Sequence, residues 1–157
     1  MSEIENIAKQ ILAKGKGILA ADESTGTMTK RLTSVNVLST VENRLKFRET
    51  LFSAEGIKNF IGGVILYDET IKQKTSSGKT IPELIKSFGS IPGIKVDTGT
   101  KKLADSPEEK VTEGLDGLRE RLSEYFKLGA RFTKWRAVYN ISEKHPSELA
   151  IKSNAQA

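Results

Sequence analysis

The stretch Gly17-Ile-Leu-Ala-Ala-Asp22 is a short apolar run that ends in a carboxylate, and similar runs recur along the chain. Charged residues stand at or near the C-terminal ends of Gly93-Ile-Lys-Val-Asp97 and within Phe132-Thr-Lys-Trp-Arg-Ala-Val138. All three runs have the composition of buried strands. Because α/β proteins place their chemistry at the carboxyl ends of parallel strands, these runs predict both the fold class and the location of a site.

Strand and helix patterns alternate through the rest of the chain. Apolar runs predict strands over 17–22, 61–67, 93–97 and 131–139. Helical spacing and capping residues predict helices over 2–13, from Ser24, from a capping box at Ser39 to about residue 54, over 81–88, from a capping box at Ser106 and from Pro146. This alternation favours a parallel sheet, and no linker indicates a second domain. We therefore predict a single α/β domain.

Composition narrows the functional classes. The 157 residues include 29% charged and 37% hydrophobic side chains, which is typical of a globular protein. The absence of cysteine excludes disulfides and thiolate metal sites and fits a cytoplasmic protein. The net charge of +5 is spread along the chain without a dense basic block, so we expect no nucleic-acid partner. No apolar run is long enough to span a membrane, and the first residues do not resemble a signal peptide.

Lys134 and Arg136 are the most unusual pair of side chains in a predicted strand. Alternation along a strand would place both on one face, flanked by Phe132 and Val138. Two cations on an otherwise apolar face are costly unless anions meet them, so we expect a phosphorylated or carboxylated small molecule. The alternative is an edge strand whose long cationic side chains reach solvent.

The other two runs admit two interpretations each. Lys95 and Asp97 would share one strand face, as parts of a site or as an internal ion pair. Asp22 precedes Ser24, which could act only as a helix N-cap. The same helix start could bind an anion, with Arg31 one to two turns along. One histidine, His145, is present, which excludes a histidine-rich metal site, and we expect it at a surface cap.

Five motifs taken together resemble class I fructose-bisphosphate aldolase, in that family's order and spacing. They are residues 15–26, 61–66, 92–97 and 114–118 and Lys134-Trp-Arg136. The resemblance implies a parallel (β/α)8 TIM barrel that needs no metal or cofactor. It also implies a lyase of glycolysis and gluconeogenesis, which reversibly cleaves fructose 1,6-bisphosphate through a Schiff base. The products would be dihydroxyacetone phosphate and glyceraldehyde 3-phosphate.

The resemblance also assigns roles to residues of this chain. Asp22 resembles the carboxylate that positions the Schiff-base lysine and the C3–C4 bond. Lys134 resembles a lysine that assists proton transfer, and Lys95 a lysine that contacts substrate. Substrate phosphates would be bound by Ser24, Thr27, Arg31, Arg44 and Arg136. Thr27 stands where the family has serine, and threonine retains the hydroxyl group.

The length of the chain departs from the family pattern. A TIM barrel needs eight strands and about 250 residues, whereas four strands are predicted here. We therefore expect residues 1–157 to be the N-terminal half of one barrel domain, without the Schiff-base lysine and acid/base glutamate, and inactive alone. The full enzyme would bind sugar phosphates and form a homotetramer. The alternatives are a non-catalytic half-barrel that binds sugar phosphates or assembles with another chain, and an imine on Lys134 itself, as in transaldolase.

Overall fold

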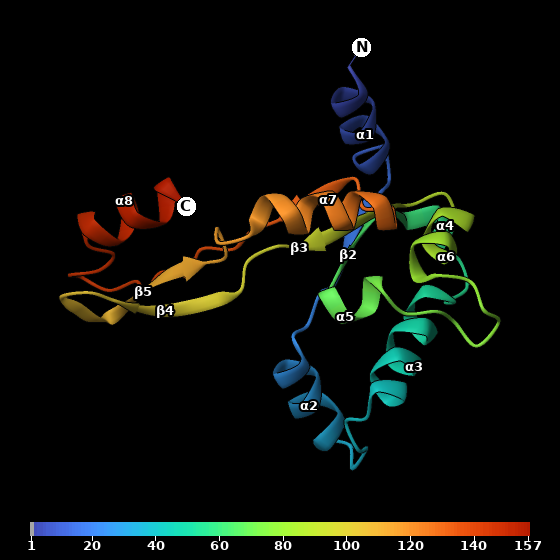
Figure 1. Cartoon of the computed structure of the whole chain (residues 1–157), viewed down its shortest axis with the longest axis horizontal. Helices are drawn as coiled ribbons and strands as arrows, with labels where there is room; N and C mark the ends of the chain where they lie inside the picture. Colours follow the sequence, from blue (N-terminus) through green and yellow to red (C-terminus); the bar gives the residue numbers. More distant parts are fainter. Residues whose placement is uncertain (1) are drawn as a thin grey trace. The chain divides into compact units, whose positions relative to one another are not determined.

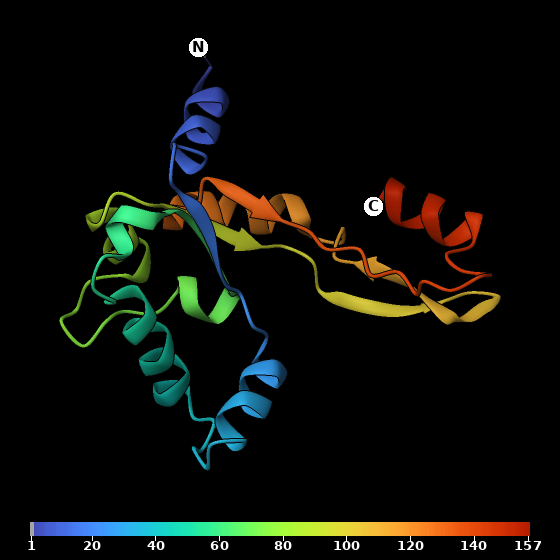
Figure 2. The same cartoon turned by 180° about the vertical axis from the view of Figure 1, so that it is seen from behind.

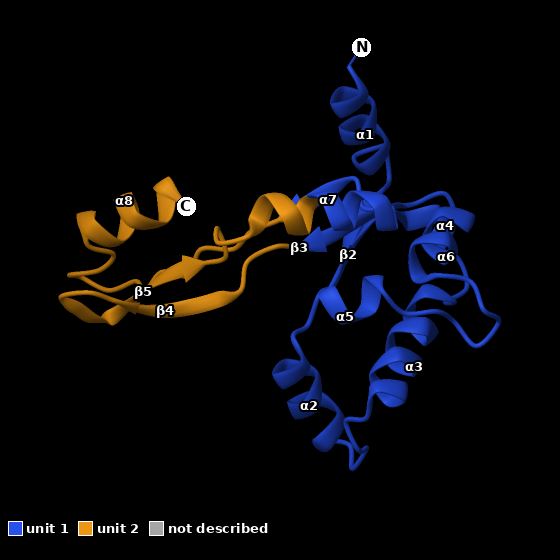
Figure 3. Ribbon diagram, in the orientation of Figure 1, with its two compact units in different colours: residues 1–95, 123–133 blue, residues 96–122, 134–157 orange. Residues whose placement is uncertain are grey.

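The structure, a computed structural model, describes residues 2–157. The chain divides into two compact units, which Figure 3 shows in blue and orange. The first comprises Met1–Lys95 and Ser123–Thr133, and the second comprises Val96–Leu122 and Lys134–Ala157. No helix within residues 2–157 has both the length and the apolar character needed to cross a bilayer. The prediction of a single barrel domain stays a prediction.

A four-stranded sheet forms the centre of the first unit (Figure 1). Its strands lie in the order β1-β2-β3-β6, with β1 at Gly17–Ala21, β2 at Ile61–Leu66, β3 at Ile91–Lys95 and β6 at Phe132–Lys134. The β1–β2 and β2–β3 pairs are both parallel. Parallel neighbours require crossover connections, and the helices between the strands supply them. The predicted α/β class with a parallel sheet is therefore confirmed.

Side-chain N-caps at Ser2, Ser24 and Thr80 begin three of the helices of the first unit. Their bounds are α1 Glu3–Ile11, α2 Thr25–Thr33, α3 Val41–Phe52, α4 Ile57–Phe60, α5 Asp68–Ile71 and α6 Ile81–Ser87, and α7 at Leu118–Leu128 runs from the second unit into the first. The capping box predicted at Ser39 is wrong. The N-cap is Thr40, whose side-chain oxygen accepts a hydrogen bond from Asn43 N at 3.1 Å. The Ser39 carbonyl instead accepts from the Arg44 guanidinium.

The two faces of the sheet are built differently. On one face Ala21, Leu66 and Ile94 lie in register across three strands, and all are buried. On the opposite face Gly93 leaves room for the ring of Phe132, because a Cβ there would lie 2.3 Å from Phe132 Cζ. A glycine is thus required at the point where β3 meets the first side chain of β6.

The second unit contains a β-hairpin and the last helix. β4 at Gly99–Leu103 pairs antiparallel with β5 at Ser106–Glu113, and α8 at Glu148–Gln156 packs on β5. Figure 2 shows this hairpin from behind. The helix predicted from Ser106 is wrong, because its capping signal depends on neighbours in sequence, whereas pairing with β4 places the segment in a strand. The helix begins twelve residues later at Leu118.

Three further boundaries differ from the sequence prediction. β3 ends at Lys95 and β6 at Lys134, so Asp97 and Arg136 lie beyond their strands. The strand alternation that placed Lys95 with Asp97 and Lys134 with Arg136 therefore does not extend to the second residue of either pair, and a shared face stays a prediction. After Lys95 the chain continues into the hairpin strand that begins at Gly99, and after Lys134 the carbonyl of Arg136 accepts a hydrogen bond from Thr112 of the same hairpin. The last helix has Ser147 rather than Pro146 at its start.

Candidate active site

The carboxyl ends of β1, β2 and β3 stand at one level of the sheet. Ala21 is in register with Leu66, and Leu66 with Ile94. Asp22 directly follows the first of these residues, and Lys95 follows the third. Because neighbouring strands lie about 4.8 Å apart, the backbones of Asp22 and Lys95 are about 10 Å apart along this edge. Both residues are half-buried, so a small molecule placed there could reach a carboxylate and an ammonium group.

The start of α2 lies next to Asp22. Ser24 is the N-cap, and its Oγ accepts a hydrogen bond from Thr27 N at 3.4 Å and lies 3.2 Å from Thr27 Oγ1. Both hydroxyls therefore sit at the positive end of the helix macrodipole. No atom lies within 4 Å of a Cβ built at Gly26, so the approach to this helix start is open. The arrangement is compatible with an anion at this position.

Two arginines with different surroundings flank Glu23. Arg31 Nη1 pairs with Glu23 Oε1, and the Arg31 side chain is 55% exposed. Arg48 Nη2 lies 3.8 Å from Glu23 Oε2, and the Arg48 side chain is only 1% exposed. Of these two arginines, Arg31 is therefore the one that presents its cation to solvent. Arg48 belongs to the interior, where burial lowers its pKa from the ordinary value.

Arg44 is occupied by protein partners. Its Nε donates to Glu69 Oε1 at 2.9 Å, its Nη2 to Glu69 Oε2 at 2.5 Å and its Nη1 to the Ser39 carbonyl at 2.6 Å. Hydrogen bonding to Glu69 raises the pKa of Arg44 above its ordinary value. All three nitrogens are engaged, so the geometry favours a link between α3 and α5 over the predicted phosphate contact.

The last two predicted site residues belong to the second unit, whereas the other six belong to the first. Lys134 ends β6 and is half-buried, and its carbonyl accepts a hydrogen bond from Val96 N at 3.1 Å. Arg136 is exposed, and its carbonyl accepts from Thr112 Oγ1 at 2.8 Å. Backbone contacts thus anchor both residues within the second unit.

Sequence reasoning missed Arg48. The signal that was available is the spacing of Arg44 and Arg48, which are four residues apart on α3 and therefore share one helix face. Both are buried. Because a buried guanidinium must be hydrogen-bonded, two arginines on the inner face of a helix indicate that each one binds acceptor groups inside the protein.

The family model "Fructose-bisphosphate aldolase class-I" matches residues 3–157. The chain belongs to the class-I fructose-bisphosphate aldolase family. A probable class 1 fructose-bisphosphate aldolase of Xylella fastidiosa is 50% identical over the whole chain, which covers 47% of that protein. Fructose-bisphosphate aldolase B of Gallus gallus is 55% identical, with 97% of this chain and 42% of that protein aligned. This family member thus spans about half the length of these curated relatives.

A solved structure shows the same relationship in three dimensions. The fructose-bisphosphate aldolase of Plasmodium falciparum, determined in complex with TRAP and a small-molecule inhibitor, superposes with a TM-score of 0.92 at 45% identity. The match covers 96% of this chain and 44% of the Plasmodium chain. The predicted resemblance is confirmed, and the parallel four-stranded sheet is part of a TIM-barrel fold.

Proposed function

We propose that this chain contributes the first part of the active site of a class I fructose-bisphosphate aldolase. The enzyme would cleave fructose 1,6-bisphosphate to dihydroxyacetone phosphate and glyceraldehyde 3-phosphate through a Schiff base, and catalyse the reverse condensation. Family membership supports this activity, and the observation that carries it is the placement of Asp22 and Lys95 at one level of the carboxyl edge. Active sites of TIM barrels lie at this edge.

The catalytic roles follow from the charges. In aldol cleavage the C4 hydroxyl loses a proton, the C3–C4 bond breaks, and its electron pair moves into the iminium formed with the Schiff-base lysine. Asp22 would hold its carboxylate close to that cationic nitrogen and the breaking bond. Lys95 would contact the substrate, and Lys134 would assist proton transfer at the C4 oxygen. Because charge develops at these atoms, preorganised ionic groups there act mainly on turnover.

Phosphate binding is proposed at two positions. Ser24, Thr27 and Arg31 would hold one phosphate, supported by the open start of α2 and the exposed guanidinium of Arg31. Arg136 would serve the other phosphate, supported by its exposure in the second unit. For Arg44 we propose a structural role, since Glu69 and Ser39 occupy its donors.

The Schiff-base lysine and the acid/base glutamate are proposed to lie outside these 157 residues. This assignment agrees with the share of the relatives' length that the chain covers, 47% and 42% in the two proteins described above. The isolated chain would then be inactive. The complete enzyme is proposed to be a cytoplasmic homotetramer, as the family resemblance implies.

The decisive experiment is Asp22→Asn in the full-length enzyme, assayed for cleavage of fructose 1,6-bisphosphate. We expect kcat to fall by about a hundredfold or more while KM changes little, because the lost charge acts on the reacting centre. Asp105→Asn is the control, since Asp105 is exposed at the hairpin turn with φ 58°, a conformation that asparagine tolerates. A wild-type enzyme without cleavage activity would overturn the proposed function.

A second assay tests whether Lys134 assists proton transfer or forms the imine itself. The 157-residue chain is mixed with dihydroxyacetone phosphate, reduced with borohydride and weighed by mass spectrometry. We expect no covalent adduct on this chain, because Lys134 is proposed to assist rather than to form the imine. A circular dichroism spectrum of the same sample is the control that tests whether the chain is folded. An adduct mapped to Lys134 would assign the imine to the fourth strand of the sheet instead.

A further inference from the structure

We propose that Arg48 is a positioning residue that holds the polypeptide on both sides of Asp22, an inference that rests on the proposed function of Asp22. The guanidinium of Arg48 reaches from α3 to the end of β1. Its Nε donates to the Ala21 carbonyl at 3.0 Å, and its Nη2 donates to the Glu23 carbonyl at 2.6 Å. One rigid, planar group therefore binds the residue before and the residue after the catalytic carboxylate.

This geometry restricts the backbone at Asp22. The Ala21 carbonyl belongs to the peptide group that enters Asp22, and the Glu23 carbonyl belongs to the peptide group that enters Ser24. Only the dihedral angles of Asp22 and Glu23 lie between these two groups. Because the nitrogens of a guanidinium have fixed relative positions, the two carbonyls cannot move independently. The Cα position of Asp22 at the exit of β1 is thereby fixed from the interior of the protein.

The surroundings of Arg48 do not favour a purely stabilising role. The residue is 0% exposed, and burial is the largest influence lowering its pKa, opposed by the charges of Glu23, Glu69 and Asp22. Within residues 2–157 its Nη1 is buried without a hydrogen-bond partner. An apolar side chain of similar volume would avoid both costs. An arginine that is costly to bury is explained by what its other two nitrogens bind.

Arg44 provides a matched control on the same helix. It lies one turn before Arg48 and is also buried, at 7% exposure. Its hydrogen bonds go to Glu69 and to the Ser39 carbonyl and not to the segment around Asp22. Replacing either arginine removes a buried cation from α3, but only the replacement of Arg48 releases the two carbonyls.

The test compares Arg48→Lys, Arg48→Met and Arg44→Met in two measurements. In the full-length enzyme we expect Arg48→Met to lower kcat by about ten- to a hundredfold, with KM for fructose 1,6-bisphosphate changing less than about threefold. Arg48→Lys should fall between wild type and Arg48→Met, since an ammonium retains the charge but cannot span both carbonyls in a fork. In the 157-residue chain we expect Arg48→Met to accelerate amide hydrogen exchange selectively over residues 21–25.

The outcomes separate this inference from the proposed function. If amide hydrogen exchange becomes faster selectively over residues 21–25 in Arg48→Met and not in Arg44→Met, the positioning role is supported. This holds even if the full-length enzyme has another activity. Uniformly faster exchange in both variants, with kcat unchanged for Arg48→Met, would show that Arg48 only stabilises the fold. If Arg48→Met does not fold, Arg48→Lys decides, because a folded lysine variant with wild-type kcat would also overturn the proposal.

Discussion

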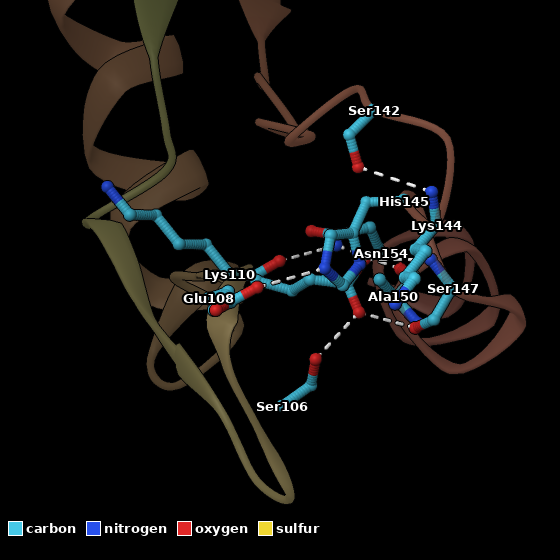
Figure 4. A network of polar contacts seen from close by, with 10 residues as sticks. Ser106, Glu108, Lys110, Ser142, Lys144, His145, Ser147, Ala150 and Asn154 are labelled. Carbon is cyan, nitrogen blue, oxygen red and sulfur yellow. Dashed lines mark hydrogen bonds and ion pairs between the residues drawn. The ribbon is translucent and has the colours of Figure 1, made fainter.

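Glu109 and Ser147 are joined by two hydrogen bonds, from Ser147 N to Glu109 Oε1 at 2.8 Å and from Ser147 Oγ to Glu109 Oε2 at 2.5 Å. Ser147 is also the N-cap of α8, where its Oγ accepts from Ala150 N at 3.1 Å. His145 lies beside the same carboxylate, with Nδ1 3.4 Å from Oε1. Figure 4 shows His145 and Ser147 within this network of polar contacts. A single side chain of β5 therefore holds the start of α8.

This contact predicts a loss of order at low pH. Hydrogen bonds from Ser147 lower the pKa of Glu109 from 4.5 to about 2. Because the folded-state pKa lies below the unfolded value, the contribution to stability is complete above about pH 4.5 and is lost as the pH falls through about 2. We expect the protection factors of amides 148–156, corrected for intrinsic exchange, to fall as the pH is lowered from 4.5 to about 2.

Glu109→Gln should lower that protection at neutral pH and remove most of its dependence on pH. Glu108→Gln is the control, because the Glu108 side chain is 73% exposed and its Oε2 lies 3.1 Å from Nε2 of His145, which is outside α8. Protection of α8 that stays constant from pH 5 to pH 2 in the wild type would contradict the assignment.

Gly93→Ala should destabilise the first unit. The added Cβ would lie 2.3 to 2.5 Å from three ring atoms of Phe132, so the ring or the strand must move. Overpacking of this kind costs about 1–3 kcal/mol in the free energy of unfolding, measurable by urea titration. Gly26→Ala is the matched control, since no atom lies within 4 Å of its Cβ. Combining Gly93→Ala with Phe132→Leu should recover part of the loss, and equal losses in both backgrounds would exclude the ring as the cause.

Arg44 and Glu69 should be energetically coupled. Removing one partner leaves the other charge poorly compensated in a site where the Arg44 and Glu69 side chains are only 8% and 22% exposed. We expect Arg44→Met to lower the free energy of unfolding by about 3–5 kcal/mol. The double variant with Glu69→Gln should lose less than the sum of the single variants, with a coupling of about 1–3 kcal/mol. Additive losses would show that the bidentate contact does not persist in solution.

Arg31→Ala should weaken substrate binding more than turnover. Its exposed guanidinium is proposed to bind a phosphate that does not change during the reaction, so its loss affects ground state and transition state alike. We expect KM for fructose 1,6-bisphosphate to rise about tenfold, with a smaller change in kcat. Lys30→Ala removes an adjacent exposed charge and should leave KM nearly unchanged. Equal KM values for Arg31→Ala and wild type would remove Arg31 from the phosphate site.

Sequence reasoning succeeded where the signals are local. The strand at Gly17–Ala21 and the N-cap at Ser24 depend on apolar runs and capping side chains that interact within a few residues. The strand–helix alternation indicated the parallel sheet, and the motifs indicated the family before any geometry was known. Sequence reasoning placed Asp22 and Lys95 at the ends of two strands, and the register of the sheet places those ends at one level.

Tertiary structure decided what depends on distant partners. The segment at Ser106 carries a helix signal but forms a strand, because pairing with Gly99–Leu103 satisfies its backbone over a longer stretch than a cap does. Three of the four residues that accept hydrogen bonds from Arg44 and Arg48 were equally invisible, since Glu69, Glu23 and Ala21 lie 25 or more residues away. Sequence by itself therefore determined the family, the fold class and the candidate residues. Which of those residues face solvent and which are held by the protein depends on long-range contacts that no local pattern encodes.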